Sequence, residues 1–138
     1  MRIICATGLH PRATWAAISR TAACPLWNRR GGHAIYIDAE RMMPHIARRQ
    51  FPAQALAVEL YRHAGIRGVE IGTLMFGDAA QHELLRLAIP RRVYTQSHMD
   101  YVVEAILEVN ERKDKIRGLE LLDAPPFLRH FSARMRPA

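Results

Sequence analysis

The chain has few of the residues that anchor covalent or metal chemistry. Cysteine occurs only at Cys5 and Cys24, which indicates neither a disulfide framework nor a metal site. The only lysines, Lys113 and Lys115, lie in the charged run NERKDK, which is typical of an exposed helix end. The sequence has no phosphate-binding glycine loop, no nucleophile elbow, no paired-carboxylate pattern and no His-x-x-x-His pair. Composition alone therefore indicates no complete catalytic set.

Long hydrophobic runs are also missing. No apolar stretch approaches the roughly 20 residues that a membrane helix needs, so we expect no membrane partner. The apolar patch near the N-terminus is broken by Gly8, His10, Pro11 and Arg12, which makes a poor signal peptide. We therefore expect a cytoplasmic chain. Its 138 residues are enough for one domain with a real core.

Acidic residues are absent from residues 1–37, which contain five arginines. The rest of the chain then holds 15 basic and 13 acidic residues, so only +2 of the net charge of +7 belongs to it. Because the excess charge is concentrated in one segment, the charge distribution does not favour a nucleic-acid partner. We treat residues 1–30 as an atypical basic N-terminal segment and residues 31–138 as the domain.

The domain alternates between strand-like and helix-like patterns. Pro52 in a first turn and Gly65 after the last turn predict a helix between them. Ser97 and Asp100 form a capping box that predicts a second, long helix, stopped by Gly118. A short helical turn is expected over ERMMPHI, and strands over HAIYIDA, IRGVEIGTLMFG, ELLRLAIP, GLELL and LRHFSARMR. The fold class is α/β: a two-layer small domain, mostly antiparallel sheet with helices on one face.

Arg86, in the predicted strand ELLRLAIP, is the main candidate for a binding residue. The alternation of a strand puts Leu85 and Leu87 on one face and Arg86 on the other, beside Leu84 and Ala88. A half-buried arginine needs an anionic partner, because an unpaired buried charge is costly. The residues alone leave two interpretations open, which are a structural ion pair with Glu70 or Glu83 and a bound carboxylate ligand.

Five blocks carry a resemblance to a known family: GGHAIYIDA, FPAQALAVELY, GIRGVEIGTLMFG, LLRLAIPRRVYTQSHMDY and LRHFSAR. In order and spacing they resemble the C-terminal part of the aromatic β-eliminating lyases, which cleave tryptophan or tyrosine. The resemblance covers residues 31–138 and implies the small domain of the aspartate-aminotransferase-type fold. It also implies an enzyme that uses pyridoxal phosphate and a monovalent cation such as K⁺, and that assembles as a homotetramer.

The resemblance assigns substrate-binding roles to four residues. Arg86 matches the arginine that holds the α-carboxylate of the substrate, a role that suits its planar fork of donors. Ile71 lies where the tyrosine-cleaving enzymes carry an arginine, and His130 matches a histidine that the tryptophan-cleaving enzymes place near the indole. Val69 shares a strand face with Ile71. These matches favour L-tryptophan, cleaved to indole, pyruvate and ammonia. The alternatives are core packing for Val69 and Ile71 and a surface position for His130.

The remaining parts of the family's active site lie upstream of the matched region. They are the Schiff-base lysine, the phosphate-binding loop, the pyridine-nitrogen aspartate, the catalytic tyrosine and the cation ligands, and neither Lys113 nor Lys115 matches the lysine. We therefore expect no catalytic, cofactor-binding or metal-binding residue in this chain, and neither pyridoxal phosphate nor K⁺ bound to it alone. The expected function is that of a C-terminal fragment of a tryptophan-cleaving lyase, inactive in isolation. The alternatives are a stand-alone amino-acid or carboxylate-binding module and, less favoured, a basic nucleic-acid-binding protein.

Residues 1–30 do not resemble the family. Back-translated with GC-rich codons and shifted by two bases, the approach to Gly31 can be read as GLPVVEPAGGH, which resembles the family's own sequence before this strand. We therefore hypothesise that residues 1–30 are an out-of-frame translation, which sequencing of the coding DNA would test.

Overall fold

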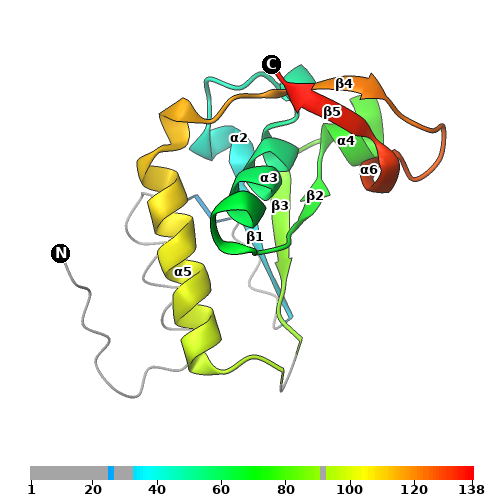
Figure 1. The fold of residues 1–138 in the computed structure, drawn as a ribbon. Coiled ribbons are helices and arrows are strands. Elements are labelled where there is room, and N and C mark those ends of the chain that lie inside the picture. The colour runs from blue at the N-terminus through cyan, green and yellow to red at the C-terminus, as the bar shows by residue number, and fades with distance from the viewer. Residues whose placement is uncertain (1–24, 27–32, 91–92) are drawn as a thin grey trace.

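The computed structural model describes residues 25–26, 33–90 and 93–138 (Figure 1). The predictions for residues 1–30, a basic segment translated out of frame, lie almost wholly outside the described residues. In that segment only Pro25 and Leu26 are placed, and Leu26 forms an isolated antiparallel bridge with Ile37.

A three-stranded antiparallel sheet forms the centre of the domain. It consists of β1 (Ala34–Asp38), β2 (Val69–Ile71) and β3 (Leu84–Ala88) in the order β1-β3-β2. Leu85 of the central strand lies opposite Ile37 and is fully buried. Leu87, two residues on, lies on the same face and is also buried. The alternation predicted for ELLRLAIP is confirmed.

The helices cover the Leu85 face of this sheet, as the sequence predicted (Figure 1). The two long helices are α3 (Pro52–Ala64) and α5 (Gln96–Glu111), which pack on each other. The core joins Leu56 and Leu60 of α3 to Ile106 and Val109 of α5. Short helical turns complete the layer or its connections: α2 (Ala39–Met42), η1 (Arg48–Gln50), α4 (Thr73–Phe76), η2 (Gly77–Ala79), η3 (Lys113–Lys115) and α6 (Arg129–Ser132). Among the described residues, no helix has the length and apolar character that crossing a membrane requires.

The predicted ends of α3 are confirmed, whereas those of α5 are wrong. Gly65 ends α3 in the left-handed conformation, with φ of 67°, which glycine adopts without steric cost. The N-cap of α5 is Thr95, two residues before the predicted capping box, and its backbone N–H donates to His98 Nδ1 at 3.1 Å. Thr95 is extended and Ser97 is already helical, so Ser97 cannot cap. The helix ends at Glu111, well before Gly118, and continues as η3.

A second, two-stranded sheet lies at one end of the domain (Figure 1). It pairs β4 (Leu119–Asp123) with β5 (Arg134–Pro137), from Leu119 opposite Pro137 to Asp123 opposite Arg134. The strand predicted over LRHFSARMR is therefore wrong in its first half, where α6 forms. In β5, pairing with β4 begins only at Arg134, which lies opposite Asp123. The connection between the two strands therefore ends in a helical turn, α6. His130 consequently lies on a short helix.

Truncation of the central strand tests this packing. Leu85→Ala should lower the free energy of unfolding by about 3 kcal/mol, because it leaves a cavity between the sheet and α3. The matched control is Leu122→Ala on β4, where the side chain is 57% exposed and the loss should stay below about 0.5 kcal/mol. Urea denaturation followed by circular dichroism measures both, and equal losses would contradict the assigned core.

Candidate functional site

Arg86 lies on the sheet face opposite the helices. In the register it sits between Tyr36 of β1 and Val69 of β2, and directly opposed residues of antiparallel strands share a face. Its side chain is half-buried. Within the described part of the chain, the guanidinium has neither a hydrogen bond nor an ion pair.

The two glutamates proposed as partners of Arg86 are used elsewhere. Glu70 lies opposite Leu85, so its side chain is on the helix-covered face, and it is only 3% exposed. Glu83 is fully buried and binds Thr73. Neither glutamate pairs with Arg86, so the ion-pair interpretation does not hold for them. The half-buried cation thus lies on the sheet face opposite the helices, without a charged partner among the described residues.

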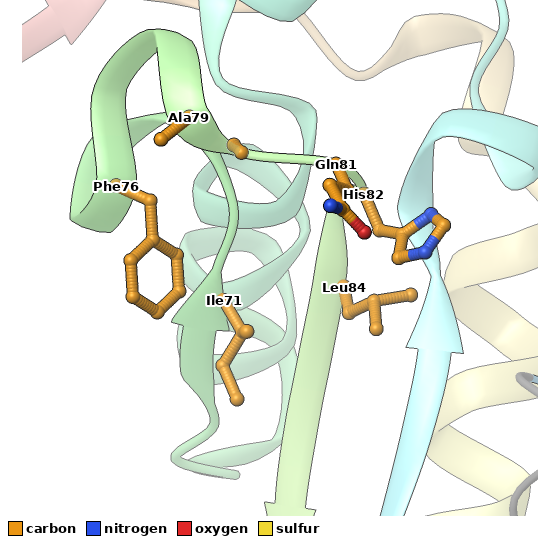
Figure 2. A pocket seen from close by; sticks show the side chains of 7 residues that line it. Ile71, Phe76, Ala79, Gln81, His82 and Leu84 are labelled. Carbon is orange, nitrogen blue, oxygen red and sulfur yellow. The ribbon is translucent and has the colours of Figure 1, made fainter.

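A shallow pocket of about 270 Å³ lies next along the same face (Figure 2). Ile71 and Leu84, which are paired in the register, form its floor, and Phe76 stands beside Ile71. The other lining residues come from the connection between β2 and β3: Ala79, Ala80, Gln81 and His82. Leu84 precedes Arg86 by two strand residues, or about 7 Å. A largely apolar pocket and a cation therefore lie side by side, an arrangement that suits a ligand with an apolar ring and a carboxylate.

Three of the four predicted site residues share this face. Val69, which is 37% exposed, is the neighbour of Arg86, and Ile71 lines the pocket. His130 does not line it. This histidine is half-buried on α6, which packs on α4, the turn that follows Ile71. The structure thus brings Val69, Ile71 and Arg86 together and leaves His130 one element away.

The far wall of the pocket is held by Arg48, which the sequence reasoning missed. Its guanidinium donates to both carboxylate oxygens of Glu40, at 2.8 and 2.7 Å. It also donates to the carbonyls of Ala80 and Gln81, at 3.3 and 3.0 Å. Four bonds from one planar fork fix the loop that closes the pocket.

The near wall is held by two buried glutamates, whose roles were also missed. Glu70 accepts hydrogen bonds from the backbone N–H groups of Leu74 and Met75, at 3.0 and 3.1 Å. Glu83 accepts from the Thr73 backbone N–H at 2.8 Å and from the Thr73 hydroxyl. These carboxyl groups satisfy the N-terminal N–H groups of α4. The strand predicted to run on to Phe76 therefore ends at Ile71. The sequence pattern that could have indicated this role is the alternation of the strand, which places Glu70 on the same face as the core residues.

The two carboxyl groups approach each other across Gly72. A Cβ atom on this residue would lie 2.6 Å from Glu83 Oε2 and 2.8 Å from Glu70 Oε1, so a larger residue would displace at least one of these hydrogen-bonded carboxyl groups. Burial raises the pKa of Glu70 to about 7, and the negative charge of Glu83 adds to this rise. The N–H groups of Leu74 and Met75 and the charge of Arg129 oppose it. Glu70 therefore changes its protonation state near neutral pH.

The described residues do not make a site for pyridoxal phosphate. Both lysines of the chain lie on η3, after the end of α5, and not on the face that carries Arg86. A Schiff base therefore has no lysine beside the pocket, and no step through this cofactor follows from the described residues. Nor do His, Cys, Asp and Glu side chains of the described residues form a group of three that could hold a metal ion.

Comparison with known proteins relates the chain to one group of enzymes. It is 56% identical over 114 residues to a tryptophanase of Salinibacter ruber, a match that spans 78% of this chain and 24% of the relative. It is 46% identical over 115 residues to a probable tryptophanase of Halobacterium salinarum, spanning 82% and 26%. A tryptophanase of Haemophilus influenzae is 49% identical over 114 residues, spanning 77% and 24%. No family model matches the chain.

These identities relate the chain to the aromatic β-eliminating lyases, the family that the sequence blocks indicated. The chain is similar to these tryptophanases, and it spans about a quarter of their length. The α/β fold with its antiparallel strands agrees with the small domain expected from the resemblance.

The protonation of Glu70 should make stability depend on pH. Its pKa is raised from an ordinary value of 4.5 to about 7 in the folded chain, so the folded chain binds this proton more tightly. The resulting stabilisation is complete below pH 4.5 and is lost as the pH rises to about 7. The loss should be on the order of 2 kcal/mol.

Urea unfolding of the wild-type chain and of Glu70→Gln, at several pH values from 5 to 8, measures this effect. The neutral glutamine cannot titrate, so the stability difference should shift in favour of the variant as the pH rises. Parallel pH profiles for the two proteins would show that Glu70 titrates at its ordinary value.

Proposed function

We propose that this domain supplies the substrate-carboxylate and indole-side contacts of a tryptophanase-like lyase acting on L-tryptophan. The single observation that carries the proposal is the position of Arg86. It lies on the central strand, on the face opposite the helices, with no hydrogen-bonding or ion-pairing partner among the described residues. A carboxylate ligand would supply the missing charge in a bidentate geometry that suits a guanidinium.

The apolar surroundings support an aromatic ring as the other end of the ligand. Ile71 and Leu84 form the pocket floor about 7 Å along the sheet from Arg86. The described residues that line the pocket include no aspartate, glutamate, lysine or arginine. An apolar wall favours a neutral leaving group such as indole. Val69 would extend this wall beside Arg86, and His130 would approach the ring from α6.

In the intact lyase, these side chains would bind and orient the substrate. Holding the α-carboxylate at Arg86 fixes the direction of the Cα–H bond, so that the enzyme's base can reach the proton. Pyridoxal phosphate supplies the electron sink for this chemistry when it is bound. In this proposal the cofactor, the monovalent cation and the tetrameric assembly belong to the whole lyase, and the location is cytoplasmic.

A chimera tests the role of Arg86 in the context of a complete relative. Residues 31–138 would replace the matching quarter of the Salinibacter ruber tryptophanase, and indole release from L-tryptophan would be measured. Arg86→Met should lower kcat/KM by roughly 100-fold or more, since it removes one partner of a buried charged pair. Arg117→Met is the matched control, because Arg117 is exposed and makes no hydrogen bond or ion pair within the described residues. Equal activity of the Arg86 and Arg117 variants would refute the proposed role.

The separate 138-residue chain should release no indole. Mixed with pyridoxal phosphate, K⁺ and L-tryptophan, it should release indole no faster than the free cofactor does, because neither lysine lies beside the Arg86 face. The active chimera is the positive control. Indole release by the chain alone, at a rate above that of free cofactor, would overturn this expectation.

A further inference from the structure

The helix α6, which carries His130, has little apolar packing to hold it in place. The large side chains around it are exposed: Phe127 by 82%, Leu128 by 67% and Phe131 by 75%. Leu128, just before the helix, is in the left-handed conformation with φ of 52°, which is uncommon for a residue other than glycine. Polar contacts must therefore contribute to fixing the position of His130.

Arg129, the residue before His130, provides such a contact. Its Nη2 atom donates to the carbonyl of Thr73 at 3.3 Å, and this bond joins α6 to α4. Within the described part of the chain, it is the only hydrogen bond from a side chain of α6 to another element. Arg129 Nε is buried and has no hydrogen-bond partner there. The guanidinium thus brings a positive charge into a largely enclosed position.

Thr73 is in turn held by the glutamate pair. Glu83 accepts from its N–H and hydroxyl groups, and Glu70 accepts from the two following residues of α4. Glu83 Oε2 is buried and has no hydrogen-bond partner among the described residues. It lies 2.6 Å, and Glu70 Oε1 lies 2.8 Å, from the position that a Cβ atom on Gly72 would take, so the two oxygens are at most 5.4 Å apart. Two carboxylates this close in a buried position cannot both ionise without a large cost.

We infer that Glu70, Glu83 and Arg129 are positioning residues for His130, acting as one charge-balanced unit in which the two carboxyl groups share a single proton. A protonated Glu70 can donate to Glu83 Oε2 and so satisfy it. The one remaining negative charge then balances Arg129. The inference rests on the proposed role of His130 beside the indole ring, and it adds how that histidine is placed.

Charged groups from three parts of the chain influence the ionisation of the glutamate pair. Glu83 lies just before β3 and Arg129 lies on α6, and both act on Glu70; Arg48 on η1 interacts with Glu83. The raised pKa of Glu70 has the direction that a shared proton requires, because burial and the charge of Glu83 outweigh the effect of Arg129. Loss of this proton leaves two negative charges opposite one guanidinium. The contact between α4 and α6 should then change near neutral pH.

Carboxyl-carbon NMR of the full 138-residue chain, labelled at glutamate Cδ, tests the shared proton. Glu83→Gln keeps an acceptor for Thr73 and removes the charge, so the pKa of Glu70 should fall toward its ordinary value. Arg129→Met should raise this pKa, and Arg129→Lys should leave it near that of the wild type. Arg134→Met on exposed β5 is the matched control. An unchanged Glu70 titration in both Glu83→Gln and Arg129→Met would overturn the inference.

The ring signals of His130, assigned by comparison with His130→Gln, test the positioning. They should move toward those of an unstructured histidine in Arg129→Met and return to the wild-type position in Arg129→Lys. Equal displacement by Met and Lys, or no displacement by either, would refute a positioning role for the charge of Arg129.

If Arg129→Met fails to fold, Glu70→Gln gives the deciding comparison. In a His130→Gln background, the backbone amide signals of Thr73 and Arg129 should move between pH 6 and 8 and stop moving when Glu70 is replaced. Persistent movement would overturn the inference. All of these measurements use the separate chain, so they can fail while the Arg86 result in the chimera stands, and the reverse also holds.

Discussion

The antiparallel register of β3 between β1 and β2 determines which side of this domain is core and which is site. Leu85 opposite Ile37 lies under the helices, and Arg86 between Tyr36 and Val69 lies on the other face. Because successive side chains of a strand point to opposite faces, a shift of one residue would bury the arginine and expose the leucines. The apolar pocket depends on the same register, since Ile71 and Leu84 are a pair within it.

The short helix α4, which follows β2, forms one side of the pocket on this sheet face. A four-residue helix cannot satisfy its own N-terminal N–H groups, and buried N–H groups need acceptors. Glu70 and Glu83 provide these acceptors from the strands on either side of α4. Arg48 fixes the other end of the same connection. The two segments that line the pocket are thus held in place by buried carboxyl groups on one side and by the bidentate Arg48–Glu40 pair on the other.

The proposed site would serve recognition. Under the proposed function, Arg86, the apolar floor and the neighbouring His130 would bind and orient the ligand, whereas the two lysines lie at the end of α5. This division agrees with a chain that spans about a quarter of the length of the tryptophanases it matches. The groups that a lyase needs for bond cleavage would have to come from the rest of such an enzyme.

The sequence determined the alternation in β3, the ends of α3, the fold class and the shared strand face of Val69 and Ile71. Each of these follows from local rules: the two-residue period of a strand, a proline in a first turn and a glycine after a last turn. It failed where a distant contact decided the conformation. The strand predicted beyond Ile71 turned into α4 because Glu83, from the next strand, accepts from Thr73. His130 was predicted on a strand but lies on α6, because β5 pairs with β4 only from Arg134 onward. Tertiary structure alone placed the buried carboxyl pair across Gly72, since the cost of burying two charges depends on which groups surround them, and no local pattern specifies those neighbours.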